Sequence, residues 1–196
     1  MHEITLPDYR ISIGASLPSW KDIRPNGDIS KVFILVDNNT KVHCLPLIPG
    51  DWPSSTVIEI SEGEQNKILN TCSLIWERLL ENNADRSSLL INLGGGVIGD
   101  MGGFVASTYK RGIRFINLPT TLLSQVDASV GGKLGIDFNG LKNVIGVFNN
   151  PKHIAISTDF LKTLPKEQIR SGFAEILKHA LISDNQYWKD LKSCRP

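Results

Sequence analysis

A glycine-rich turn in the middle of the chain has residue types and spacing that suit phosphate binding. Gly94, Gly96 and Gly99 match the pattern G-x-G-x-x-G directly after the apolar run 88–93. Glycine lets the backbone turn tightly and approach a pyrophosphate, whose charge then faces the N–H groups of a helix N-terminus. Glycines also end strands for steric reasons alone, so the pattern by itself leaves a nucleotide site and a plain turn equally open.

The acidic partner of such a turn is placed unusually in this sequence. A standard dinucleotide fold holds the ribose with a carboxylate about 20 residues after the glycines, but residues 115–121 contain none. Asp37 ends an earlier apolar run, 32–37. Because ligands bind at the carboxyl ends of parallel strands, Asp37 is the better candidate, and we expect a variant arrangement of the site.

The elements that must position these residues alternate between strands and helices. β-rich runs cover 32–37, 56–60, 88–93, 113–118 and 153–157, and residues 66–80 carry apolar side chains at helical spacing. This alternation predicts an α/β fold with a mostly parallel sheet and helices, to which the first 13 residues could add a small antiparallel edge. After Pro165 the pattern is helical over 166–183 and 185–191.

Composition excludes several classes of protein. The 196 residues are 41% hydrophobic with a net charge of +1, and no basic run is interleaved with aromatic residues, so we expect no nucleic-acid partner. No apolar stretch approaches the length of a membrane span, so we expect no membrane partner and a cytoplasmic location. Cys44, Cys72 and Cys194 are odd in number and lack C-x-x-C spacing, which favours idle thiols over disulfides or a thiolate metal site.

Six blocks of the sequence, in order, resemble 3-dehydroquinate synthase. They are GGGVIGD (94–100), FVASTYKRG (104–112), LPTTLL (118–123), VDASVGGK (126–133), KNVIG (142–146) and GFAEILK (172–178). The resemblance implies a Rossmann-like NAD-binding domain over 1–165 and the first helices of a truncated all-α domain over 166–196. It also implies a homodimer, with NAD and a divalent metal, zinc or cobalt, as cofactors.

The activity that the resemblance implies is a step of the shikimate pathway. A phosphorylated sugar acid, 3-deoxy-D-arabino-heptulosonate 7-phosphate, is converted to 3-dehydroquinate and phosphate. The reaction oxidises an alcohol, eliminates phosphate, reduces the ketone again and closes a ring, so NAD returns to its starting state. The metal serves as a Lewis acid in such chemistry.

The resemblance also implies the residues that hold NAD. It places Asp37 and Asn39 at the adenosine ribose, and Asp100 near the nicotinamide. Without it, charged residues at a helix start, such as Glu64 and Lys67, would be interpreted as a solvated first turn. The full implied set is Asp37, Asn39, Glu64, Lys67, Gly95, Gly96, Val97, Asp100, Thr120, Thr121, Leu123, Asp127, Lys142, Thr163, Leu164 and Gln168.

One member of this set allows another role, and one differs from the family pattern. Thr120 follows the expected strand 113–118, where a helix-capping role is as consistent with its type as a nucleotide contact. Gln168 stands where the family usually has a glutamate. An amide can still donate and accept hydrogen bonds, but it cannot supply a negative charge.

Basic and amide side chains form the implied substrate site. The resemblance places Lys133, Asn143 and Arg111 around the phosphate, with Arg111 reaching across a dimer interface. Charged donors suit a phosphate dianion because they make the stronger hydrogen bonds. The full implied catalytic set is Lys133, Lys142, Asn143, Arg111, Asp127 and Lys178.

The metal site is incomplete in this sequence. Glu175 matches the family's glutamate ligand, but the family's two histidine ligands come from the C-terminal helical domain, and none of the four histidines here matches them. His179 lies four residues after Glu175, so on a helix the two share a face and could bind one ion together, although two ligands hold a metal weakly. Such a histidine is more often a packing or surface residue.

Two kinds of function therefore remain open. The chain is the nucleotide-binding part of a 3-dehydroquinate synthase, expected to be inactive by itself, or it is an NAD-binding module without turnover. A related sugar-phosphate cyclase or a polyol dehydrogenase is a third possibility, although the basic residues favour a phosphorylated substrate.

The helix face with Ile169, Phe173, Ile176, Leu177 and Ala180 predicts dimerisation or aggregation if it is left uncovered.

Overall fold

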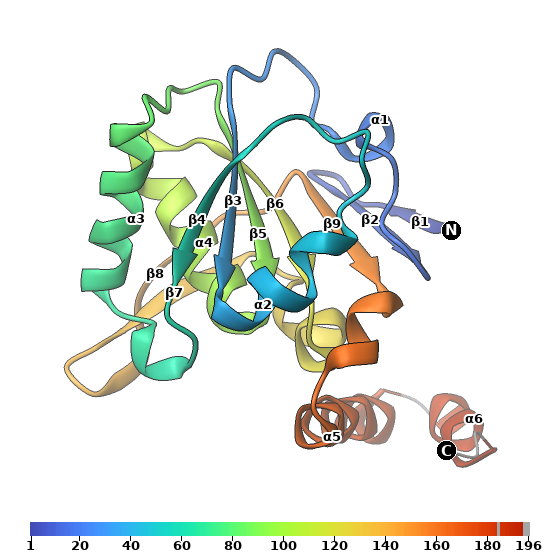
Figure 1. The fold of residues 1–196 in the computed structure, drawn as a ribbon. Coiled ribbons are helices and arrows are strands. Elements are labelled where there is room, and N and C mark those ends of the chain that lie inside the picture. Colours follow the sequence, from blue (N-terminus) through green and yellow to red (C-terminus); the bar gives the residue numbers. More distant parts are fainter. Residues whose placement is uncertain (184, 194–196) are drawn as a thin grey trace.

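A twisted seven-stranded sheet forms the centre of the computed structural model, which describes residues 1–183 and 185–193 (Figure 1). Its strand order is β1-β2-β9-β6-β5-β3-β4; β1 is antiparallel to β2, and all other neighbours are parallel. The strands are β1 (His2–Thr5), β2 (Arg10–Gly14), β3 (Val32–Asp37), β4 (Thr56–Ile60), β5 (Leu89–Gly94), β6 (Arg114–Pro119) and β9 (His153–Ser157). The predicted α/β fold and its antiparallel edge are confirmed.

Both faces of the sheet are covered, which explains why the central strands are almost wholly apolar. On β3, Phe33 and Leu35 pack against one layer, which contains α3 (Leu69–Glu81) and α4 (Gly96–Thr108). Ile34 and Val36 point to the opposite side. That second layer contains α1 (Trp20–Ile23), α2 (Asn38–His43) and the 3-10 turns Leu45–Leu47 and Thr158–Thr163.

The strand order produces a crevice at one edge of the sheet. From β3 the chain moves outward to β4, and it then returns to place β5 on the other side of β3. Helices α2 and α4 therefore leave neighbouring strands on opposite faces, as Figure 1 shows. In open α/β sheets, ligands bind in the crevice at this kind of reversal.

The helix predicted over 66–80 begins later than expected. Residues Glu64–Asn66 form a 3-10 turn, and α3 starts at Leu69. Between them Ile68 is extended and forms a parallel bridge with Asp137, while the backbone N–H of Asp137 donates to the Lys67 carbonyl at 2.8 Å. A tertiary contact thus overrides the helical spacing of this segment.

A two-stranded hairpin, which the sequence analysis did not predict, packs beside α4. It consists of β7 (Lys133–Phe138) and β8 (Leu141–Phe148), with Leu134 and Ile136 buried in the α3–α4 layer. Asn139 (φ 50°) and Gly140 (φ 77°) form its two-residue turn. An Asn-Gly pair between two strands is a strong hairpin signal, so the sequence did carry this information.

Two helices follow the sheet, at the positions expected from the sequence. They are α5 (Lys166–Ile182), which lies beyond the carboxyl ends of the strands, and α6 (Asn185–Ser193) (Figure 1). The predicted apolar face of α5 is only partly uncovered: Phe173 is exposed, Ile169, Ile176 and Leu177 are half-buried, and Ala180 is buried. In residues 1–183 and 185–193, no helix has the length and apolar character needed to cross a membrane.

The cysteines behave as idle thiols where the structure describes them. Cys44 and Cys72 are buried and free, and burial raises the pKa of the Cys44 thiol to about 11 and that of Cys72 to about 12. Cys194 lies outside the described residues. Neither described thiol therefore ionises near neutral pH.

Candidate functional site

A cleft of about 760 Å³ lies at the carboxyl ends of β3, β4, β5 and β6, next to the start of α5. It gathers most of the residues that the sequence pointed to for NAD. Those that line it are Asp37, Asn39, Glu64, Lys67, Gly95, Gly96, Val97, Asp100, Thr120, Thr121, Leu123, Thr163, Leu164 and Gln168. Asp127 and Lys142 are not part of the lining, although Lys142 reaches the cleft edge through an ion pair with Glu64 at 3.2 Å.

The glycine-rich turn joins β5 to α4 at the floor of the cleft. A Cβ atom on Gly94 would lie 2.5 Å from Ile98, and one on Gly95 would lie 3.1 Å from Thr121. Glycine is therefore needed where the strand, the helix and the next loop approach one another. Because the first N–H groups of a helix have no partner within the helix, the start of α4 can bind an anion in the cleft.

Asp37 sits at the end of β3, as expected, but part of its carboxylate is already engaged. Its Oδ1 accepts hydrogen bonds from the Thr40 backbone N–H at 2.8 Å and from the Thr40 hydroxyl at 3.0 Å. These bonds make Asp37 the N-cap of α2 in a capping box. The carboxylate is thus held rigidly at the cleft, with Oδ2 as the oxygen that can face a ribose hydroxyl.

Lys67 differs from the solvated residue that its sequence context indicates, because its side chain is buried. Only 3% of the residue is exposed, so the interpretation as a solvated helix turn is wrong for Lys67. Its ammonium donates to Asp100 Oδ2 at 2.6 Å and to Asn143 Oδ1 at 2.6 Å. Burial raises the pKa of Asp100, while the hydrogen bond from Lys67 opposes that rise. An acid beside an anion-binding turn is thereby balanced by a cation.

The two threonines after β6 have different roles. Thr120 is buried, and its backbone N–H donates to the Gly94 carbonyl at 3.0 Å, which ties β6 to the glycine turn. Thr121 makes the cap-like contact instead: its hydroxyl oxygen accepts from the Ser124 backbone N–H at 3.1 Å. The short π-helical turn Ser124–Ala128 begins there and leads to Asp127.

The residues implied for the phosphate do not converge within this chain. Lys133 pairs with Phe148, so Asn143 lies ~17 Å further along β8 at ~3.4 Å per residue. Arg111 is exposed just before β6, at the amino end of the sheet and therefore opposite the cleft. The structure thus brings Asn143 to Lys67 but leaves Lys133 and Arg111 elsewhere.

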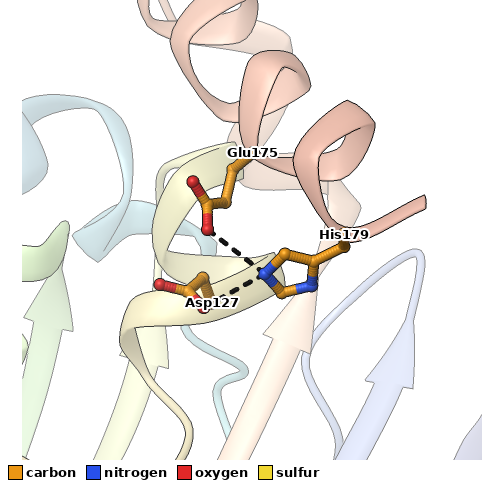
Figure 2. Close-up of side chains that lie close together, drawn as sticks. All are labelled: Asp127, Glu175 and His179. Atoms are coloured by element: carbon orange, nitrogen blue, oxygen red, sulfur yellow. Dashed lines mark hydrogen bonds and ion pairs between the residues drawn. The ribbon is translucent and has the colours of Figure 1, made fainter. Parts of the chain in front are cut away.

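A second cluster lies where α5 meets the turn Ser124–Ala128 (Figure 2). His179 Nε2 is 3.2 Å from Glu175 Oε1 and 3.3 Å from Asp127 Oδ1. Lys178 also forms an ion pair with Glu175, which lowers the pKa of Glu175 and raises that of Lys178. The sequence pointed to the Glu175–His179 spacing, but not to Asp127 as the third member.

Several other lining residues of the cleft were missed by the sequence analysis. His43 lies in α2, Glu62 lies in the loop after β4, and Gln65 lies in the 3-10 turn Glu64–Asn66. Asn39, in α2, donates a hydrogen bond to Glu62, which links α2 to the loop after β4. For Glu62 and Gln65 the usable signal was their position shortly after β4, whose carboxyl end lies at this edge. His43 stands at the end of α2, six residues after β3.

Known proteins resemble this chain in sequence. A family model described as 3-dehydroquinate synthase N-terminal matches residues 57–171. The 3-dehydroquinate synthase of Parabacteroides distasonis is 52% identical over 156 residues, which are 78% of this chain and 44% of that protein. That of Clostridium tetani is 56% identical over 124 residues, 63% of this chain and 33% of that protein. The chain thus spans less than half the length of these curated relatives.

Solved structures of two other synthases have a similar fold. 2-epi-5-epi-valiolone synthase from Streptomyces hygroscopicus subsp. jinggangensis 5008, solved with NAD⁺ and Zn²⁺ bound, superposes with a TM-score of 0.82 at 26% identity, covering 93% of this chain and 52% of that chain. A 2-deoxy-scyllo-inosose synthase, at 24% identity and a TM-score of 0.79, covers 90% of this chain and 51% of its own, and shows the shared fold. The chain belongs to the 3-dehydroquinate synthase family, and residues 57–171 match its N-terminal part.

Proposed function

We propose that this chain is the NAD-binding part of a 3-dehydroquinate synthase that converts 3-deoxy-D-arabino-heptulosonate 7-phosphate to 3-dehydroquinate and phosphate. The observation that carries the proposal is the cleft, because fourteen of the residues that the resemblance implies for NAD line one cavity at the sheet reversal. In this proposal residues 1–165 form the nucleotide domain, and 166–196 begin a helical domain for metal and substrate.

The cleft has the chemistry that NAD requires. Its volume of about 760 Å³ lies within the usual range for small-molecule sites. We assign the pyrophosphate to the N-terminus of α4 at Gly95 and Gly96, and the adenosine ribose to Asp37 and Asn39. When bound, NAD would accept a hydride from the substrate and return it later, which oxidises and then reduces one carbon.

The remaining assignments concern the substrate and the metal. Glu175 would hold a divalent ion, which would polarise a substrate oxygen. Lys178 stands next to it as a cation for the substrate. Lys133 and Asn143 are assigned to the phosphate, a role that requires the β7–β8 hairpin to change, because the two residues lie far apart along it.

Arg111 and Lys142 complete the proposed assignments. The exposed position of Arg111, opposite the cleft of its own chain, suits a contact with a second copy in a homodimer. Lys142 stands at the cleft edge through Glu64. A cytoplasmic location belongs to the same proposal.

The proposal is tested by titrating the chain with NAD⁺ in a calorimeter. We expect saturable binding by the unchanged chain, and at least tenfold weaker binding by Gly96→Asp than by Gly96→Asn. A Cβ atom fits at Gly96, because it would lie 3.6 Å from its nearest neighbour, the Cβ of Ala128. An acid also suits a helix N-terminus, so Asp would not disturb folding, but its charge would repel a pyrophosphate.

Each outcome bears on a different part of the proposal. The Asn variant has the same size as the Asp variant without its charge, so it controls for steric effects. Equal affinities for the two variants would contradict the placement of the pyrophosphate at α4. A folded chain that does not bind NAD⁺ at all would contradict the proposed cofactor role of the cleft.

A further inference from the structure

Strand β8 contains a bulge that carries two residues of the proposed site. The register of the β7–β8 hairpin shifts at Asp137, so that this one residue of β7 lies opposite three residues of β8, 142–144. A bulge bends its strand and turns side chains in new directions, and bulges are common next to active sites. Both Lys142 and Asn143 lie in this 142–144 bulge.

The side chains of the bulge reach the cleft from outside it. Asn143 Oδ1 accepts a hydrogen bond from the Lys67 ammonium at 2.6 Å. The Lys142 ammonium lies 3.2 Å from Glu64 Oε1. Lys67 and Glu64 both line the cleft, whereas Lys142 and Asn143 do not. The bulge therefore supplies one contact to each of two cleft residues.

The backbone of the bulge is not that of an ordinary strand. Asn143 has a φ of 54°, in the left-handed region that residues other than glycine adopt rarely. Asparagine tolerates this region better than most residues. Such a conformation persists where surrounding contacts hold it in place.

Asp137 provides those contacts. Its Oδ1 accepts a hydrogen bond from the backbone N–H of Asn143 at 2.8 Å. Its own backbone N–H donates to the Lys67 carbonyl at 2.8 Å, next to the parallel bridge between Asp137 and Ile68. Asp137 thus joins the bulge to the same segment whose Lys67 side chain meets Asn143.

We propose that Asp137 is a positioning residue for the cleft, because its carboxylate fixes the 142–144 bulge and so keeps Asn143 at Lys67 and Lys142 at Glu64. The inference rests on the proposed function and adds a residue outside the set that lines the cleft. Without this carboxylate, the bulge would have to be ordered when NAD binds, which costs conformational entropy. The competing explanation is that Asp137 only stabilises the hairpin.

The ammonium group of Lys67 reports the position of the bulge. Burial protects this group from exchange with water, so its signal can be followed in proton–nitrogen NMR spectra. Asp137→Ala should shift or broaden the signal, because Asn143 leaves Lys67. Asp137→Asn should keep the signal, because the amide oxygen can accept the same hydrogen bond.

Calorimetry with NAD⁺ on the same samples tests the consequence for the cleft. We expect binding at least fivefold weaker for Asp137→Ala than for the unchanged chain, and restored by Asp137→Asn. Asp190→Ala is the matched control, because Asp190 is an exposed aspartate whose carboxylate accepts from Gln186 within α6. Circular dichroism would show that each variant is folded. A purely structural role would lower stability without changing the affinity of the folded variant.

The outcomes separate this inference from the proposed function. An unchanged Lys67 signal or an unchanged NAD⁺ affinity in folded Asp137→Ala would overturn the positioning role. Independently of any variant, the Asn143 backbone N–H should exchange slowly with deuterium, and rapid exchange would overturn it too. A folded, unchanged chain that does not bind NAD⁺ contradicts the proposed function, while the Lys67 signal still decides whether Asp137 holds the bulge.

Discussion

Replacing Lys67 with methionine should destabilise the protein strongly, because this lysine joins three parts of the structure. Its side chain is 4% exposed, and its ammonium lies 2.6 Å from Asp100 Oδ2 in α4 and 2.6 Å from Asn143 Oδ1 in β8. Methionine has a similar length and apolar volume, so the substitution removes mainly the charge and the two hydrogen bonds. Asp100, at 21% side-chain exposure, would be left without its cation.

The expected cost follows from the burial of the pair. Removing one partner of a buried ion pair costs about 3–5 kcal/mol, because the other charge stays desolvated. The control is Lys41→Met, which breaks the exposed pair with Glu59, where the side-chain exposures are 49% and 35%. Exposed pairs contribute about 0–1 kcal/mol, so the two lysine variants should differ by at least about 2 kcal/mol.

Urea denaturation followed by circular dichroism would measure these free energies of unfolding. Asp100→Asn in the Lys67→Met background should recover at least about 1 kcal/mol, because it removes the unpaired charge. A loss below about 1 kcal/mol for Lys67→Met, with no recovery in the double variant, would refute the reasoning. It would mean that Asp100 reaches water or another cation once the lysine is gone.

Two further substitutions test other parts of the fold. Burial lowers the pKa of His153 to about 4 from its usual 6.5, so the folded protein keeps it neutral while the unfolded chain takes up a proton below pH 6.5. Stability should therefore fall by about 2 kcal/mol between pH 7.5 and pH 5, and His153→Gln should lack this part of the loss in denaturation at the two pH values; equal losses would contradict it. Gly172→Ala should loosen α5 and speed its cleavage by trypsin, because the added methyl group would lie 2.5 Å from the Leu123 backbone nitrogen. Gly99→Ala is the control, since its methyl group would meet nothing within 4 Å, and equal protection in both variants would show that α5 does not depend on this approach.

Most of the sheet and the position of the cleft could be predicted from the sequence. The strand β3 is a continuous apolar run up to Asp37, and β5 and β6 are mostly apolar apart from Asn92, Arg114 and Asn117, because both faces of these strands are buried; this pattern is local. The glycine turn after β5 is also local, because the strand, the turn and the start of α4 are consecutive. Parallel strands then bring Asp37 and this turn to one edge, whatever the details of packing.

The sequence carried one local signal that was overlooked. Asn139 and Gly140 both adopt positive φ in the turn between β7 and β8, which is the conformation that this pair of residues favours. The alternation of Leu134 and Ile136 toward the core is also visible in the sequence. The hairpin was thus predictable in principle.

Only the tertiary structure decided the environments of the charged residues. Lys67 has the sequence context of a solvated helix start, and it is buried because β8 brings Asn143 and α4 brings Asp100 to it from distant parts of the chain. Asp127 joins Glu175 and His179 for a similar reason, since the docking of α5 closes a separation of about 50 residues. Local patterns of apolar residues and glycines fix strands and turns, because they act over a few residues. Burial and pairing of charges depend on which elements meet, and no short stretch of sequence contains that information.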